Sequence, residues 1–197
     1  TSVSHFGFMV LGIFALTTQS ISGSIFYMLN HGFSTAALFL VIGYLAKRRG
    51  SVQITDFGGV FQVAPVLAGI TLLGGLASLS LPGMGSFVGE FLVLAGTWSR
   101  YPVVAAVACL GMVLAALYIL IMYQRVFTGP VTEATREHFT GDASWLERIA
   151  VAPVIVLLLL VGFFPKPVLD LADQTAKATM TTMNISDPAP AAGKEGR

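Results

Sequence analysis

Charged side chains are scarce in this chain of 197 residues. Asp, Glu, Lys and Arg together make up only 11% of it, against roughly 25% in soluble globular domains. None of the four occurs in residues 1–46, 101–124 or 149–165, and hydrophobic residues make up 55% of the whole. A helix needs about 20 predominantly apolar residues to cross a lipid bilayer. The scarcity of charge excludes an ordinary soluble protein and predicts one that crosses a membrane several times.

Cysteine and basic clusters are nearly absent as well. Cys109 is the one cysteine, so an internal disulfide is impossible, and its place in an apolar span predicts a small buried side chain. The net charge is +1 and the one basic run is Lys47-Arg48-Arg49, which argues against a nucleic-acid partner. No phosphate-binding glycine loop, nucleophile elbow or cluster of metal ligands occurs. We therefore predict no catalytic, cofactor-binding or metal site in this chain.

The apolar segments predict an all-α polytopic membrane protein. Only helices and closed barrels satisfy every backbone group within lipid, and strand-like alternation of polar and apolar residues is absent. The first apolar segment begins without Met or a signal-peptide cleavage site, so we expect the C-terminal part of a longer protein. A membrane domain is predicted over residues 1–165 and a tail over residues 166–197, disordered from about residue 186. The predicted spans cover about residues 3–18, 22–46, 60–98 with a break near 80–86, 102–123 and 149–164.

The third span should be a discontinuous helix. Its middle is the run from Ser80 to Ser86, in which Pro82 and Gly83 interrupt helical hydrogen bonding. The part after the break is only about 12–14 residues long, or roughly 20 Å at 1.5 Å per residue, which is short for an independent span. Broken helices are tolerated where they are buried in protein or line a wet cavity. The break therefore predicts a position inside the protein or beside water.

Positive charges distinguish the two ends of the predicted bundle. When the broken helix counts as one span, six basic residues of the loops fall on one side, and Arg100 with Lys166 at the start of the tail fall on the other. Lys and Arg are enriched in cytoplasmic loops, so the six mark the cytoplasmic side and the tail ends outside. The six are Lys47, Arg48, Arg49, Arg125, Arg136 and Arg148.

Glu90 is the one charged residue between Phe57 and Ser99. A carboxylate at bilayer depth costs several kcal/mol unless it is protonated, paired or wetted, so an ionisable residue there indicates function. Ser86 lies one turn earlier and could hydrogen-bond to Glu90. Burial and nearby charge can tune such a carboxyl group to load and release a proton. The alternative is a fixed ion pair that holds the helix break in place.

His5 and His31 are the other groups in the apolar spans that can change charge near neutral pH. One helix face carries a polar stripe at spacings of 3, 4 and 4 residues, formed by Ser24, Tyr27, His31 and Thr35. A polar face on a membrane helix turns to protein or water, so we predict that both histidines take part in function. The alternatives are interhelical hydrogen bonds for the stripe and a structural histidine held by Ser2 for His5.

Four motifs together resemble those of a known family. They occur in order at residues 2–7 (SVSHFG), 30–39 (NHGFSTAALF), 79–91 (LSLPGMGSFVGEF) and 123–130 (YQRVFTGP). The chain resembles the antiporter-like proton-channel subunits of respiratory complex I, NADH:quinone oxidoreductase, and within them the subunit M group, the counterpart of mitochondrial chain 4. The resemblance covers about residues 1–167. Related subunits and Mrp-type cation/proton antiporters usually carry Lys at the position of Glu90, so Glu90 favours the subunit M group.

This resemblance implies a fold and a mechanism. The fold is an inverted-repeat helix bundle, of which this chain supplies most of the second repeat's broken-helix unit. His5 and His31 match positions on the family's hydrophilic axis at the membrane mid-plane, and Glu90 matches the acidic residue of the outward half-channel. The complex uses FMN, iron–sulfur clusters, NADH and quinone in other subunits, and this chain should bind none of them. Its partners would be neighbouring antiporter-like subunits and the lipid bilayer, most naturally the bacterial inner or plasma membrane.

Two other function classes fit the same sequence. An Mrp-type cation/proton antiporter subunit would exchange cations such as sodium for protons, without oxidising NADH. A purely structural membrane subunit would hold Glu90 in a buried ion pair, and removal of Glu90 would then affect assembly or nothing at all.

Overall fold

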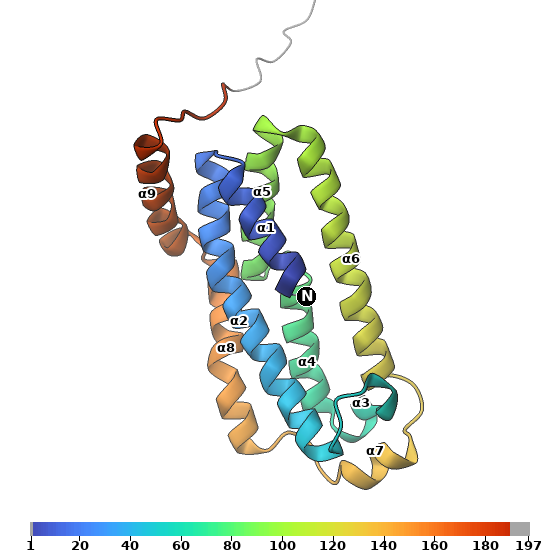
Figure 1. Cartoon of the computed structure of the whole chain (residues 1–197). Helices are drawn as coiled ribbons and strands as arrows, with labels where there is room; N and C mark the ends of the chain where they lie inside the picture. Colours follow the sequence, from blue (N-terminus) through green and yellow to red (C-terminus); the bar gives the residue numbers. More distant parts are fainter. Residues whose placement is uncertain (1, 190–197) are drawn as a thin grey trace, which may run out of the picture.

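The computed structural model describes residues 2–189, and these residues form an elongated bundle of helices (Figure 1). A short 3-10 turn at Ile54–Asp56 links α2 to the next α-helix. In chain order the α-helices are α1 (Ser2–Phe14), α2 (Thr18–Arg49), α3 (Val60–Val63), α4 (Pro65–Ser78), α5 (Gly85–Arg100), α6 (Pro102–Phe127), α7 (Glu133–His138), α8 (Trp145–Phe163) and α9 (Lys166–Thr182).

Helix α2 is the centre of the bundle, and it packs against α1, α4, α5, α8 and α9. It begins at Thr18 because Thr17 and Ser20 form a capping box, in which each side chain accepts a hydrogen bond from the other's backbone N–H. It ends at Gly50, whose φ of 72° closes the last turn. The polar run at residues 17–20 is therefore a helix start, whereas the second span was predicted from about residue 22.

The chain leaves helical geometry between α4 and α5. Ser80 and Gly83 have φ values of 58° and 100° in this break, which covers residues 79–84 and was expected near residues 80–86. A second interruption was not expected. The predicted continuous helix from residue 60 is divided at Ala64, because Pro65 has no N–H to continue the helix and instead starts α4.

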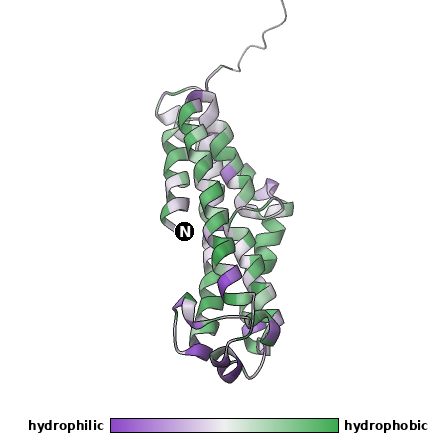
Figure 2. Cartoon of the chain, turned by 90° about the vertical axis from the view of Figure 1, so that its right-hand side faces the viewer, coloured by the Kyte–Doolittle hydropathy of each residue, from purple (hydrophilic) through white to green (hydrophobic). Residues whose placement is uncertain are grey.

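Three of the described helices, α2, α6 and α8, are long and apolar enough to cross a membrane. Helices α1 and α4 are apolar but shorter, so the five-span arrangement, with α4 and α5 as one broken span, stays a prediction. Exposed apolar side chains cover the outer faces of α6 and α8, for example Val107, Leu114 and Leu160. Hydrophobic residues run along the helices and hydrophilic residues gather at the lower, loop-bearing end (Figure 2). Cys109 lies on the exposed face of α6, so the prediction that it is buried was wrong.

The loop end of the bundle is held by polar contacts around residues 125–148, which lie between the predicted spans 102–123 and 149–164. Ser144 and Glu147 form a capping box at the start of α8. Glu147 also accepts two hydrogen bonds of 2.7 Å from the Arg48 guanidinium at the end of α2. Asp142 accepts the backbone N–H groups of Val66 and Leu67, at 2.8 and 3.0 Å, and so caps α4. These contacts tie α2, α4 and α8 together at one end.

The tail from residue 166 is more ordered than the sequence indicated. Helix α9 buries Ala172, Ala176 and Met180, and the last two pack with Ile21 of α2. Beyond it, Asp187 accepts the backbone N–H of Thr18 at 2.7 Å. The predicted disorder from about residue 186 falls mainly on residues 190–197, which lie outside the described residues.

Candidate functional site

Glu90 lies in the interface between α5 and α2, with 2% of its surface exposed. Glycines on α5 allow the two helices to approach closely here. A Cβ atom at Gly89 would lie 2.6 Å from the Cβ and 2.9 Å from the Cα of Tyr27, and one at Gly85 would overlap the Asn30 side chain. Only glycine fits at these two positions. The run of glycines after the helix break therefore places the Glu90 carboxyl group against the polar face of α2.

The Glu90 carboxyl group meets side chains from two other helices. The Tyr27 hydroxyl of α2 donates a hydrogen bond to Glu90 Oε1 and is also hydrogen-bonded to His5 Nδ1 of α1. His5 Nδ1 lies 3.3 Å from Glu90 Oε1. His5 and Tyr27 are as deeply buried as Glu90, at 2% and 1% exposed. Residues 5, 27 and 90, which are far apart in the sequence, thus form one buried polar cluster, which we call the His5–Tyr27–Glu90 cluster.

His31 lies at the edge of this cluster and is 8% exposed. Its ring centroid is 5.0 Å from that of His5 and 6.3 Å from that of Tyr27. The Thr35 hydroxyl lies 3.3 Å from His31 Nε2. His31 is therefore close enough to His5 for their charges to interact, but its side chain hydrogen-bonds to Thr35 and to no other residue of the described range.

The remaining predicted polar residues have different surroundings. Ser24 Oγ donates to the Met9 carbonyl oxygen at 2.8 Å, so this member of the stripe joins α2 to α1, as the structural alternative proposed. Within residues 2–189 the Thr35 side chain hydrogen-bonds only to His31. Ser86 was expected to bond to Glu90. Its buried hydroxyl makes no hydrogen bond within residues 2–189, so that expectation was wrong.

Sequence reasoning missed the surroundings of two buried tyrosine hydroxyls. Tyr27 was recognised only as one member of a polar stripe, because nothing in the spacing of residues 27 and 90 reveals that their side chains meet. Tyr118 was not singled out, although its hydroxyl is buried in α6 without a hydrogen-bond partner among the described residues. A tyrosine in an otherwise apolar span is the one sequence signal for it.

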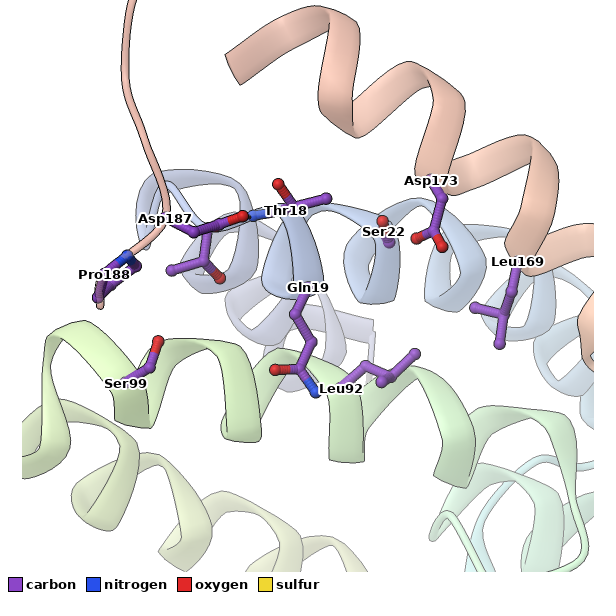
Figure 3. A pocket seen from close by; sticks show the side chains of 10 residues that line it. Thr18, Gln19, Ser22, Leu92, Ser99, Leu169, Asp173, Asp187 and Pro188 are labelled. Carbon is purple, nitrogen blue, oxygen red and sulfur yellow. The ribbon is translucent and has the colours of Figure 1, made fainter. Parts of the chain in front are cut away.

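A separate groove lies between the start of α2, the later part of α5, and α9 with the segment that follows it (Figure 3). Asp173 of α9 faces Ser22 of α2 there, and Asp187 lies beside Thr18. None of His5, His31 and Glu90 lines this groove. The ionisable groups singled out from the sequence thus lie in a buried helix interface and not in an open pocket.

Comparison with known proteins identifies relatives of this arrangement. Residues 1–118 match a family described as "NADH:quinone oxidoreductase/Mrp antiporter, TM". The chain is 54% identical over 190 residues to NADH-quinone oxidoreductase subunit M of Mycobacterium tuberculosis strain H37Rv. The matched region covers 96% of this chain and 34% of that protein. Subunit M of Rickettsia prowazekii is 38% identical over 171 residues, covering 87% of this chain and 35% of the relative. The chain therefore spans about a third of the length of the curated relatives it matches.

Two solved structures are similar in fold. Respiratory complex I from Thermus thermophilus with bound NADH contains a chain that is 34% identical, with a TM-score of 0.78, covering 88% of this chain and 37% of that one. A chain of the Mrp complex from Dietzia sp. DQ12-45-1b has a TM-score of 0.79 at 21% identity, covering 92% of this chain and 42% of that one. At that identity the second similarity extends to the fold alone.

Proposed function

Because this chain belongs to the NADH:quinone oxidoreductase/Mrp antiporter transmembrane family, we propose that it translocates protons as part of a complex I membrane subunit. The His5–Tyr27–Glu90 cluster is the observation that supports this most. It combines two groups that can exchange a proton with full burial at the junction of three helices. The similarity to subunit M chains, over nearly all of this chain, favours complex I as the setting.

In the proposed mechanism His31 and His5 pass protons towards Glu90, and Glu90 releases them on the outer side. A buried carboxylate without a partner is costly, whereas a protonated carboxyl group or one paired with an imidazolium is tolerated. Proton transfer from His5 to Glu90 converts an ion pair into two neutral groups, so the site can hold a proton in either arrangement. The driving redox chemistry takes place elsewhere, with FMN, iron–sulfur clusters, NADH and quinone held by other subunits.

The proposal also covers location and partners. The apolar outer faces of α6 and α8 fit a lipid bilayer or neighbouring antiporter-like subunits of the complex. The end of the bundle that carries Arg48 and α7 would face the cytoplasm of a bacterial cell, because positively charged loops remain on that side. Helices α4 and α5 would together form the discontinuous helix of one inverted repeat.

Replacement of Glu90 by Gln in the full-length protein, within the assembled complex, tests this function. We expect NADH-driven acidification of inverted membrane vesicles to fall sharply, because glutamine has nearly the same shape but exchanges no proton near neutral pH. Glu137→Gln is the matched control, since Glu137 is exposed on α7. Pumping at the wild-type rate in an assembled Glu90→Gln complex would contradict the proposal.

The fold similarity to the Mrp complex chain supports a second candidate, a cation/proton antiporter subunit. The two differ in what drives transport. Transport that requires sodium and proceeds without NADH oxidation would favour the antiporter, whereas pumping that requires NADH oxidation and not sodium would favour complex I. Loss of assembly alone in Glu90→Gln, with normal pumping by whatever complex remains, would instead fit a structural role.

A further inference from the structure

Tyr27 lies between the two titratable groups of the site, and we propose that its hydroxyl conducts the proton from His5 to Glu90. This inference rests on the proposed function. The hydroxyl is hydrogen-bonded to His5 Nδ1 on one side and to Glu90 Oε1 on the other. No other side chain of the described residues contacts both groups in this way.

The hydrogen-bonding capacity of the three groups fits one chain of donors. A phenol hydroxyl has a single proton to donate and oxygen lone pairs to accept with, whereas an ionised carboxylate only accepts. When His5 carries a proton on Nδ1, it donates to the Tyr27 oxygen, and Tyr27 donates to Glu90. The Tyr27 hydroxyl and Glu90 Oε1 then each have a partner, and both protons lie along one path that leads to the carboxylate. His5 Nε2 is buried and makes no hydrogen bond within residues 2–189.

The transfer itself needs only two proton shifts. The N–H bond at His5 Nδ1 breaks as an O–H bond forms at the Tyr27 oxygen, while the original Tyr27 O–H bond breaks and an O–H bond forms at Glu90 Oε1. The imidazolium becomes a neutral imidazole and the carboxylate becomes a neutral carboxyl group. Tyr27 ends with one proton, as it began, so neither a tyrosinate nor a redox partner is required. Rotation of the hydroxyl resets the chain.

A direct transfer from His5 to Glu90 is the competing route. The 3.3 Å between His5 Nδ1 and Glu90 Oε1 is long for a charge-assisted N–H···O hydrogen bond, which is typically about 2.7–2.9 Å. The hydroxyl contacts both groups more closely than they contact each other. Gly89 packs against the Cα and Cβ of Tyr27, and this packing holds the phenol in place. The direct contact is therefore an electrostatic pair, and the hydroxyl supplies the path.

Replacement of Tyr27 by Phe in the full-length protein of the assembled complex removes the hydroxyl and keeps the ring. We expect NADH-driven proton pumping in inverted vesicles to fall at least about tenfold, since a positioned proton-transfer group typically contributes 10²–10⁴-fold. Tyr123→Phe is the control, because among the described residues the Tyr123 hydroxyl of α6 bonds only to the Ala68 carbonyl oxygen, at 3.4 Å. It should pump at the wild-type rate.

A second variant separates conduction from structural support. Incorporation of 3-fluorotyrosine at position 27 keeps the hydroxyl protonated and makes it a readier proton donor, so the pumping rate at a fixed pH should change while assembly stays normal. A tyrosine that only supports the fold would leave the pumping rate unchanged, and that result overturns the inference even if Tyr27→Phe fails to assemble. Wild-type pumping by Tyr27→Phe beside defective pumping by Glu90→Gln would also overturn it and leave the proposed function standing. Wild-type pumping by both variants would refute the proposed function itself.

Discussion

Replacement of Gly89 by Ala is the sharpest test of how the fold builds this site. The added methyl group would lie 2.6 Å from Tyr27 Cβ, 2.9 Å from its Cα and 3.1 Å from its backbone nitrogen. Carbon atoms in contact are normally about 3.5–4.0 Å apart, so α5 and α2 would have to separate locally by about 1 Å. The obstructing atoms belong mainly to backbone and cannot rotate away.

The expected energies make the effect on pumping larger than the effect on stability. Overpacking of this kind typically costs about 1–3 kcal/mol, and alanine recovers up to about 1 kcal/mol of helix propensity relative to glycine. The net loss of stability should be about 0–2 kcal/mol. A separation of about 1 Å, by contrast, lengthens and weakens the Tyr27–Glu90 hydrogen bond on which the proton path depends. The complex should therefore assemble and pump poorly.

The assay compares Gly89→Ala with Gly43→Ala in the full-length protein. An added Cβ at Gly43 of α2 meets no atom of the described chain within 4 Å. Native gels measure assembly, and NADH-driven vesicle acidification measures pumping. We expect reduced pumping for Gly89→Ala and wild-type pumping for Gly43→Ala. Wild-type pumping and assembly in Gly89→Ala would refute the reasoning that close packing of α5 on α2 sets the position of Glu90.

Three further predictions concern the loop end of the bundle, and each is measured as the thermal stability of the detergent-solubilised complex. Asp142→Ala should lower the free energy of unfolding by about 1 kcal/mol, because a helix cap is lost. Burial alone would raise the pKa of the Asp142 carboxyl group, but its hydrogen bonds from backbone N–H groups outweigh burial and lower the pKa. The advantage of wild type should therefore be present above the usual Asp pKa of about 3.9 and disappear as the pH falls below it, and a difference independent of pH would contradict the cap. Arg48→Ala should cost about 1.5–3 kcal/mol through its charge-assisted hydrogen bonds to Glu147, and a double-mutant cycle with Glu147→Gln that gives no coupling energy would argue against the pair. Gly59→Ala should destabilise by about 1–3 kcal/mol, because φ is 64° there and a Cβ would lie 2.7 Å from the backbone of Val131; unchanged stability would mean that the loop adapts.

Local chemistry explains which parts of the fold could be predicted. The capping box at Ser144 and the glycine that follows Lys47-Arg48-Arg49 act within a few residues, so their sequence signals are sufficient. Helix α2 begins before the predicted residue 22, because Thr17 and Ser20 cap it, and these residue types occur in turns as well as at helix starts. The sequence did not predict a helix break at Pro65, because the residues around it are apolar. The division between α3 and α4 arises because Pro65 has no backbone N–H to continue the helix.

Contacts between distant segments explain what could not be predicted. Helix α9 lies in a segment that the sequence indicated only as a tail, because its burial depends on Ile21 of α2. The isolation of Glu90, His5 and His31 in apolar sequence singled these residues out, but no periodicity relates α1 to α5. The placement of the Tyr27 hydroxyl between His5 and Glu90 depends on how three helices pack, and this information exists only in the folded chain.

The central claim is that a carboxyl group at position 90 exchanges the proton that is pumped. The most direct measurement is the number of protons translocated per NADH oxidised, in vesicles that hold equal amounts of assembled complex with Glu90, Asp or Gln at this position. The account predicts that Glu90→Gln loses proton translocation and that Glu90→Asp, which retains a carboxyl group, keeps part of it. A Glu90→Gln complex that translocates as many protons per NADH as wild type, at the same rate, would contradict it.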